Sequence, residues 1–216
     1  RNAYRRIAMA TYISGSDAKA VFLTADTVAL DADGLSVAAT LGGAANLTLG
    51  GALTSGGSAT FNAGRIITIL SAGDDSGDTL TVTGTDVNGD AQTEEITGAD
   101  TGTATGTKYF KTVSQIAING ASAGDVSAGV NSSVADVVFA GRARLKGIRI
   151  MDSATAGTLV FPTTSPTGTT TMQLSTVASA TVLDDVTIPA EGVLFTAGIY
   201  IQYTRSTFTT ATVFYA

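Results

Sequence analysis

The chain has 216 residues, a net charge of −6, and neither histidine nor cysteine. The missing imidazole and thiol groups exclude His- and Cys-based catalytic triads, thiolate metal sites and disulfides. The acidic balance disfavours direct nucleic-acid binding, which draws its affinity from Lys and Arg. The sequence also lacks the run of about 20 apolar residues that a membrane helix needs. We therefore expect a protein that is not an enzyme, has no cofactor or metal, and contacts neither nucleic acid nor membrane.

The low charge content predicts a protein surface that is poor in charged side chains. Soluble domains usually carry roughly 25% charged residues, whereas this chain has 14%, together with 25 glycines. A surface so poor in charge suits burial against other subunits better than contact with open water. We expect the chain to work inside an assembly.

The chain is predicted to begin with an extended N-terminal arm, residues 1–20, in which Arg1, Arg5 and Arg6 form a basic cluster. A Gly/Thr-rich β domain is predicted to follow at residues 21–135, because β-branched runs alternate there with Gly, Asn, Asp and Ser turns. No window shows a convincing helical periodicity over three turns. The strands expected in this domain are residues 28–30, 35–39, 47–49, 52–53, 65–70, 79–84, 92–97 and 108–118.

The pair Asn88-Gly89 lies between two of these strands and predicts a tight hairpin, because both residues tolerate positive φ. The acidic residues around it, within 86–90, are spaced like the start of a calcium loop. However, Ala91 and Thr97 stand where an EF-hand needs its turn glycine and its bidentate glutamate. We expect a polar turn here and at the second acidic loop, residues 74–78, with calcium binding as the alternative.

The sequence contains no other convincing pattern of catalytic or phosphate-binding residues. Glu94 and Glu95 are adjacent on a predicted strand, so they point to opposite faces and cannot act as a paired acid and base. The glycines form neither a phosphate loop nor a Gly-x-Ser-x-Gly elbow between strand and helix. No catalytic, cofactor-binding or metal-binding residues are predicted.

The character of the sequence changes near residues 131–140, where we place a crossover between domains. Residues 136–216 are predicted as a C-terminal β-sandwich with strands at 142–151, 158–161, 170–174, 186–188, 193–195, 199–203 and 212–215. Within it Arg142, Arg144 and Lys146 alternate, so a strand would display them on one face. This basic stripe, with Arg5 and Arg6, is the predicted interface, although a solvated strand face is an equal alternative. The predicted fold class is all-β, with two small antiparallel sandwich or jelly-roll modules.

Several segments resemble known virion proteins. The segments GRIITILSAGDDSG (64–77), TVTGTDVNG (81–89), EEITG (94–98), YFKTV (109–113) and GDVSAG (124–129) resemble modules of structural proteins in tailed bacteriophages. In the C-terminal part, GIR (147–149), GTLVF (157–161), PAEGVLF (189–195) and GIYI (198–201) are similar to small β-sandwich proteins of marine phage particles. The resemblance implies a structural role in a decoration, cement, fibre or tail protein, without catalytic residues.

The resulting hypothesis is a capsid decoration or cement protein of a phage virion, assembled in the host cytoplasm. Its expected partners are the major capsid protein and copies of itself, in a homotrimer. One alternative is a tail, fibre or spike component, because residues 46–54 (NLTLGGALT) are similar to segments in which fibre chains wind closely together. A less favoured alternative is a carbohydrate-binding β module, for which exposed aromatic residues are the usual platform; only Tyr and Phe are available here, because Trp is absent.

Overall fold

The computed structural model describes residues 18–189 and 191–216, and this part of the chain is all-β, with antiparallel strands and no helix. Nothing in it forms a helix long and apolar enough to cross a membrane. The strands are β1 (Lys19–Thr24), β2 (Asp31–Thr40), β3 (Ala45–Asn46), β4 (Thr54–Ser55), β5 (Ser58–Asp74), β6 (Thr79–Thr85), β7 (Ala91–Thr97), β8 (Asp100–Ile118), β9 (Asp125–Phe139), β10 (Ala143–Asp152), β11 (Gly157–Pro162), β12 (Thr170–Thr176), β13 (Leu183–Thr187), β14 (Val193–Phe195), β15 (Ile199–Thr204) and β16 (Phe208–Tyr215).

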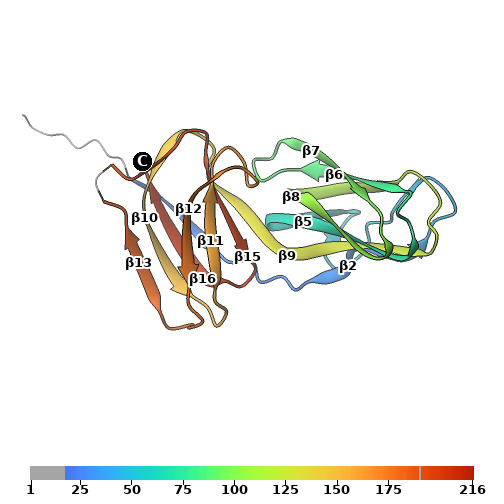
Figure 1. Cartoon of the computed structure of the whole chain (residues 1–216), viewed down its shortest axis with the longest axis horizontal. Coiled ribbons are helices and arrows are strands. Elements are labelled where there is room, and N and C mark those ends of the chain that lie inside the picture. Colours follow the sequence, from blue (N-terminus) through green and yellow to red (C-terminus); the bar gives the residue numbers. More distant parts are fainter. Residues whose placement is uncertain (1–17, 190) are drawn as a thin grey trace, which may run out of the picture.

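The strands form two sheets and two bodies that lie end to end (Figure 1). The larger sheet has the order β12-β11-β15-β9-β5-β8-β6-β7, with β2, β3 and β4 added on β9, β8 and β5. The smaller sheet has the order β1-β16-β10-β13, with β14 also on β10. We call the body built from β2 to β8 the first module, and the body built from β1 and β10 to β16 the second module.

Each module has its own apolar core. The first core draws side chains from β2 and from β5 to β9, such as Leu35, Ile67 and Phe110, which are fully buried. The second core lies between the small sheet and the β9-β15-β11-β12 part of the large sheet, with Ile148, Phe161 and Ile201 at its centre. Alternating apolar residues explain both cores, because every second side chain of a strand points to the same side.

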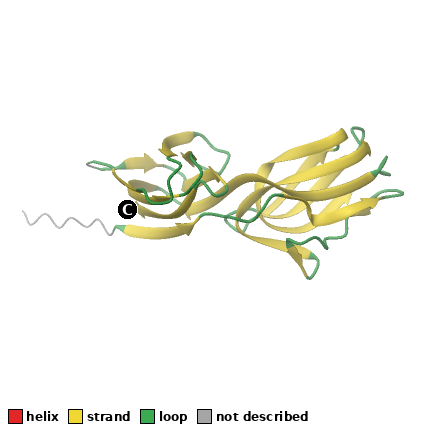
Figure 2. Ribbon diagram, turned by 90° about the horizontal axis from the view of Figure 1, so that it is seen from below, coloured by secondary structure: helices red, strands yellow, loops and turns green. Residues whose placement is uncertain are grey.

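Strand β9 connects the modules. Its first half contributes Val126 and Val130 to the first core, and its second half contributes Val134 and Val138 to the second. Figure 2 shows a long, bent strand that passes between the two bodies. The crossover predicted at residues 131–140 is thus largely continuous strand, and the predicted division after residue 135 falls inside β9.

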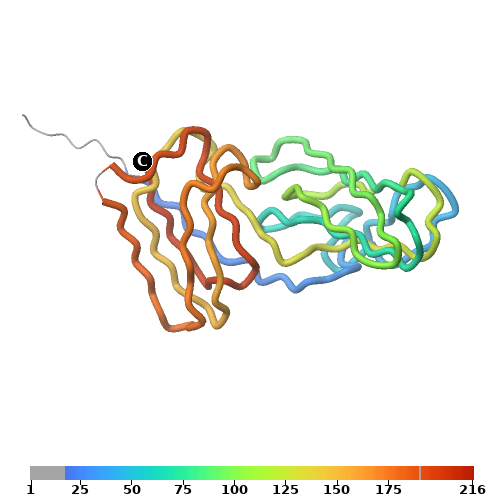
Figure 3. Tube along the Cα trace, viewed as in Figure 1, coloured from blue at the N-terminus to red at the C-terminus, as the bar shows by residue number. Residues whose placement is uncertain are grey.

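Strand β1 gives the second difference from the predicted domain boundaries. Residues 19–24 pair with residues 210–215 of β16, so the second module is built from both ends of the described chain. The chain leaves this module along the residues between β1 and β2 and returns along β9, as the blue and yellow segments of Figure 3 show. Residues 21–24, predicted to belong to the first domain, therefore belong to the second module. The rest of the predicted arm, residues 1–17 with Arg5 and Arg6, lies outside the described residues.

The predicted hairpin joins β6 and β7, with a different turn geometry. Gly89 has a φ of 90°, whereas Asn88 is not among the residues with positive φ. The N–H of Gly89 donates to the carbonyl of Asp86 (3.1 Å), and the N–H of Asp86 donates to the carbonyl of Asp90 (2.9 Å). This is a three-residue loop that needs one left-handed residue, which only the glycine supplies.

Candidate interaction surface

The small sheet buries one face in the second core and leaves the other uncovered by described residues. Val21 and Leu23 of β1 pack on the core, so the residues between them point outward. The strand registers align the outward residues in three rows that cross the sheet. We call these twelve residues the outer face: Ala20, Phe214, Gly147 and Thr187; Phe22, Thr212, Arg149 and Asp185; Thr24, Thr210, Met151 and Leu183.

The outer face is apolar and poor in charge for an exposed surface. Phe22 is 67% exposed, Leu183 43% and Phe214 36%. Arg149 and Asp185 are its only charged members, and they stand opposite each other in the β10–β13 register. The remaining members are threonines and small or apolar residues. Apolar groups on a flat sheet face, with few charges to keep them hydrated, are typical of a surface that packs against another protein.

The predicted basic stripe only partly forms. Arg142 precedes β10 and is exposed, whereas Arg144 and Lys146 are half-buried within the strand. Arg144 Nη1 donates to the carbonyl of Gly192 (3.4 Å), and Lys146 Nζ donates to the carbonyl of Glu191 (3.0 Å). Both side chains therefore hold the loop before β14 in place. They are less available to a partner than the sequence spacing predicts.

Sequence reasoning missed Arg149 as a surface cation. Leu145 pairs with Tyr215 and Gly147 with Phe214, so β10 carries one extra residue, Lys146, at this point. The bulge changes which residues point outward and brings Arg149 onto the outer face. A strict two-residue alternation cannot reveal such a bulge.

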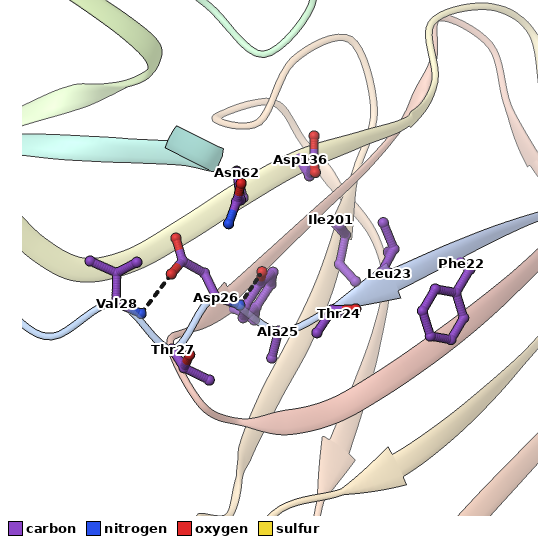
Figure 4. Close-up of a pocket in the computed structure, with 12 residues that line it drawn as sticks. Phe22, Leu23, Thr24, Ala25, Asp26, Thr27, Val28, Asn62, Asp136 and Ile201 are labelled. Carbon is purple, nitrogen blue, oxygen red and sulfur yellow. Dashed lines mark hydrogen bonds between the residues drawn. The ribbon is translucent and has the colours of Figure 1, made fainter. Parts of the chain in front are cut away.

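A hollow of about 440 Å³ lies where the modules meet, beside the end of β1. It is lined by residues 22–28, by Asn62 and Ala63 of β5, and by Asp136, Ile201 and Tyr203 (Figure 4). Burial raises the pKa of Asp136, while Lys111, 3.7 Å away, opposes that change. Burial also raises the pKa of Tyr203 to about 12, so its hydroxyl keeps its proton at neutral pH.

The junction also contains a buried ion pair. Arg65 Nη1 of β5 lies 3.4 Å from Asp26 Oδ2, and both side chains are almost completely buried. The carboxylate also accepts the N–H of Val28 (2.8 Å), while the N–H of Asp26 donates to Tyr203 Oη (3.2 Å). Burial lowers the pKa of Arg65, and the Asp26 charge works against that shift. The pair thereby ties the segment between β1 and β2 to β5 and β15.

The two acidic loops form turns. At the tip of the β6–β7 hairpin, Asn88 Nδ2 donates to Tyr200 Oη of the second module (3.3 Å), and Val87 packs with Tyr200 in a small apolar cluster. In the other loop, Asp75 is fully buried and its Oδ1 accepts the N–H of Ala123 (2.7 Å). Within the described ranges, no three acidic side chains are grouped in a way that would hold a metal ion.

Comparison with known proteins identifies no relative. No family model matches the chain, and neither a curated protein nor a solved structure is significantly similar to it.

Proposed function

We propose that this chain is a structural protein of a virus particle, a capsid decoration or cement protein that stabilises the shell through subunit contacts. The outer face is the observation that carries the proposal. It offers exposed Phe22, Phe214 and Leu183 on one sheet face, with one cation and one anion. The resemblance of residues 64–129 to phage virion modules supports the same class of function.

The physical argument for this function is the apolar surface area that subunit contacts would bury. Burial of apolar surface contributes roughly 25 cal/mol per Å², and many identical contacts add up around a closed shell. Ionic contacts contribute little when they are exposed. A charge-poor outer face thus suits a protein that holds a particle together by repeated packing, with the major capsid protein and copies of itself as partners.

The structure explains the segment behind the fibre alternative in another way. Leu47 and Leu49 are buried in the first core. A Cβ on Gly51 would overlap the backbone of Asp33 and Gly34. The small residues of this segment thus let strands of one chain approach one another, and they give no specific support to a winding of several chains. The head role remains the better proposal, and labelling the subunit on particles would distinguish head from tail.

The test uses particles that lack this protein. We expect the purified chain to rebind them, and the double variant Phe214→Asp/Leu183→Asp to bind more than tenfold more weakly, because two carboxylates would enter an apolar contact. The control is Val37→Asp, since Val37 is 52% exposed on β2 of the first module. Failure of the unmodified chain to bind would overturn the proposed function. Equal binding by the double variant and the control would exclude the outer face as the contact.

A further inference from the structure

Among the described residues, strand β1 is an edge strand of the small sheet with one unpaired edge. It pairs with β16, and no other described strand pairs with it. The hollow at the module junction is lined on one side by residues 22–28, so the end of β1 borders a cavity. An uncovered edge presents a row of unpaired backbone donors and acceptors, which is a template for another strand.

The hydrogen bonding to β16 shows which residues supply that row. Thr24 pairs with Thr210, and the N–H of the next residue, Ala25, donates to the carbonyl of Thr209 (3.2 Å). Successive residues of a strand direct their N–H and C=O groups to alternate edges. Val21 and Leu23 therefore bond toward β16. Ala20, Phe22 and Thr24 direct their backbone groups toward the free edge.

The usual protections of an edge strand are missing from β1. Such strands are normally blunted by proline, by a bulge, or by charged side chains. The sequence KAVFLT contains no proline, its six residues pair with β16 without a register shift, and Lys19 at its start is its only charge. Phe22, in the middle of the strand, is 67% exposed.

We propose that β1 pairs antiparallel with β1 of a second copy of this chain, across a two-fold axis at Phe22. In this register Phe22 lies opposite Phe22 of the second copy, Ala20 lies opposite its Thr24, and Val21 lies opposite its Leu23. Outward-facing residues therefore pair with outward-facing residues. The free backbone groups of Ala20, Phe22 and Thr24 all find partners, and Lys19 meets Ala25 instead of another charge. A shift by one residue would place outward side chains against inward ones.

The pairing deepens the proposed function, on which it rests for the identity of the partner as another copy. The two small sheets would become one continuous sheet, and the two outer faces would join on one side of it. The contact is closed and two-fold. It therefore gives a dimer in place of the trimer expected from the sequence.

A cysteine at the axis tests the geometry directly. The chain has no cysteine. Directly opposite residues in a hydrogen-bonded antiparallel pair have Cα atoms about 5.5 Å apart, which is within disulfide reach. Under mild oxidation of the full-length chain, we expect Phe22→Cys to form a disulfide-linked dimer of twice the 21.6 kDa chain mass. Thr212→Cys, one strand inward on the same face, should stay monomeric on a non-reducing gel.

Charge swaps provide the second test. We expect light scattering to find a dimer for the unmodified chain and monomers for Phe22→Lys and for Phe22→Glu, because like charges would then stand opposite each other. An equimolar mixture of the two variants should recover the dimer. Val177→Lys, at an exposed position (51%) away from β1, should remain dimeric.

A monomer or a trimer for the unmodified chain, or equal crosslinking of the Phe22→Cys and Thr212→Cys variants, would overturn the pairing. Particle binding is a separate measurement. If the chain rebinds depleted particles but does not dimerise, only this inference is contradicted. If it dimerises but does not bind the particles, only the proposed function is contradicted.

Discussion

Arg65 and Asp26 form a buried ion pair, 3.4 Å between Nη1 and Oδ2, at the point where the two modules meet. Arg65 Nη2 also donates to the carbonyl of Val28 (3.3 Å), while Nε has no partner among the described residues. The cation is thus held by one carboxylate and one carbonyl. Its burial is costly unless Asp26 stays in place.

We expect Asp26→Ala to lower the free energy of unfolding by about 3 to 5 kcal/mol, because Arg65 would remain buried without its counter-ion. The double variant Asp26→Ala/Arg65→Met should lose clearly less than the sum of the two single variants, since it leaves no unpaired charge. Urea denaturation of the four proteins measures this coupling. Additive losses would mean that the two side chains do not stabilise each other.

Asp136 gives the protein a specific pH dependence. Burial raises its pKa above the ordinary value of 3.8, with Lys111 opposing the shift. The folded chain thus keeps this proton at pH values where the unfolded chain has released it. The resulting stability is complete below the unfolded pKa and is lost as pH rises through the folded one.

We expect the unfolding free energy of the unmodified chain, relative to Asp136→Asn, to fall as the pH rises above the ordinary aspartate pKa of 3.8. The variant Lys111→Met removes the opposing cation, so it should shift this decrease in unfolding free energy to higher pH. Urea denaturation at each pH gives the curves. Parallel curves for the unmodified chain and Asp136→Asn would show that the carboxyl group has the same pKa in both states.

Glu94 stabilises an irregular part of β8. Ile66 of β5 pairs with Tyr109, and Thr68 pairs with Thr105, so residues 106–108 face a single residue of β5. The Glu94 carboxylate accepts the N–H of Thr107 (2.5 Å) and the N–H of Lys108 (3.1 Å). It supplies the acceptors that the regular ladder would otherwise provide.

We expect Glu94→Ala to cost about 1 to 3 kcal/mol of unfolding free energy, because two partly buried N–H groups lose their acceptor. The matched control is Glu95→Ala on the opposite, exposed face of β7, which should change stability by less than about 0.5 kcal/mol. Thermal and urea unfolding compare the two variants. An equal effect would mean that the carboxylate of Glu94 does not hold the bulge.

The regular strands were predictable because they follow a local pattern. Residues 65–70, 79–84, 92–97 and 108–118 were all expected as strands, and each lies within β5, β6, β7 or β8. Their alternating β-branched residues carry the information within a few positions. The all-β class follows from the same signal.

Features that depend on distant residues were not predictable in this way. The pairing of β1 with β16 joins positions almost 200 residues apart, and nothing in KAVFLT specifies that partner. The bulges at Lys146 and at residues 106–108 depend on cross-strand registers. These features decide the interaction surface, because they put Phe22 on an edge and Arg149 on the outer face. The predicted stripe of Arg142, Arg144 and Lys146 relied on an unbroken alternation.

Gly129 of β9 lies where the paired strand β2 approaches it closely, at an irregularity in the β2–β9 register. A Cβ at this position would overlap the carbonyl oxygen of Asp31 and atoms of Ala32, whereas a Cβ on Gly77, in an exposed turn, would meet nothing within 4 Å. We expect Gly129→Ala to cost at least about 2 kcal/mol, because backbone must move to make room. Gly77→Ala should stay within about 0.5 kcal/mol of the unmodified chain. Urea denaturation compares the two, and equal stability would show that β2 can move away from β9 at little cost.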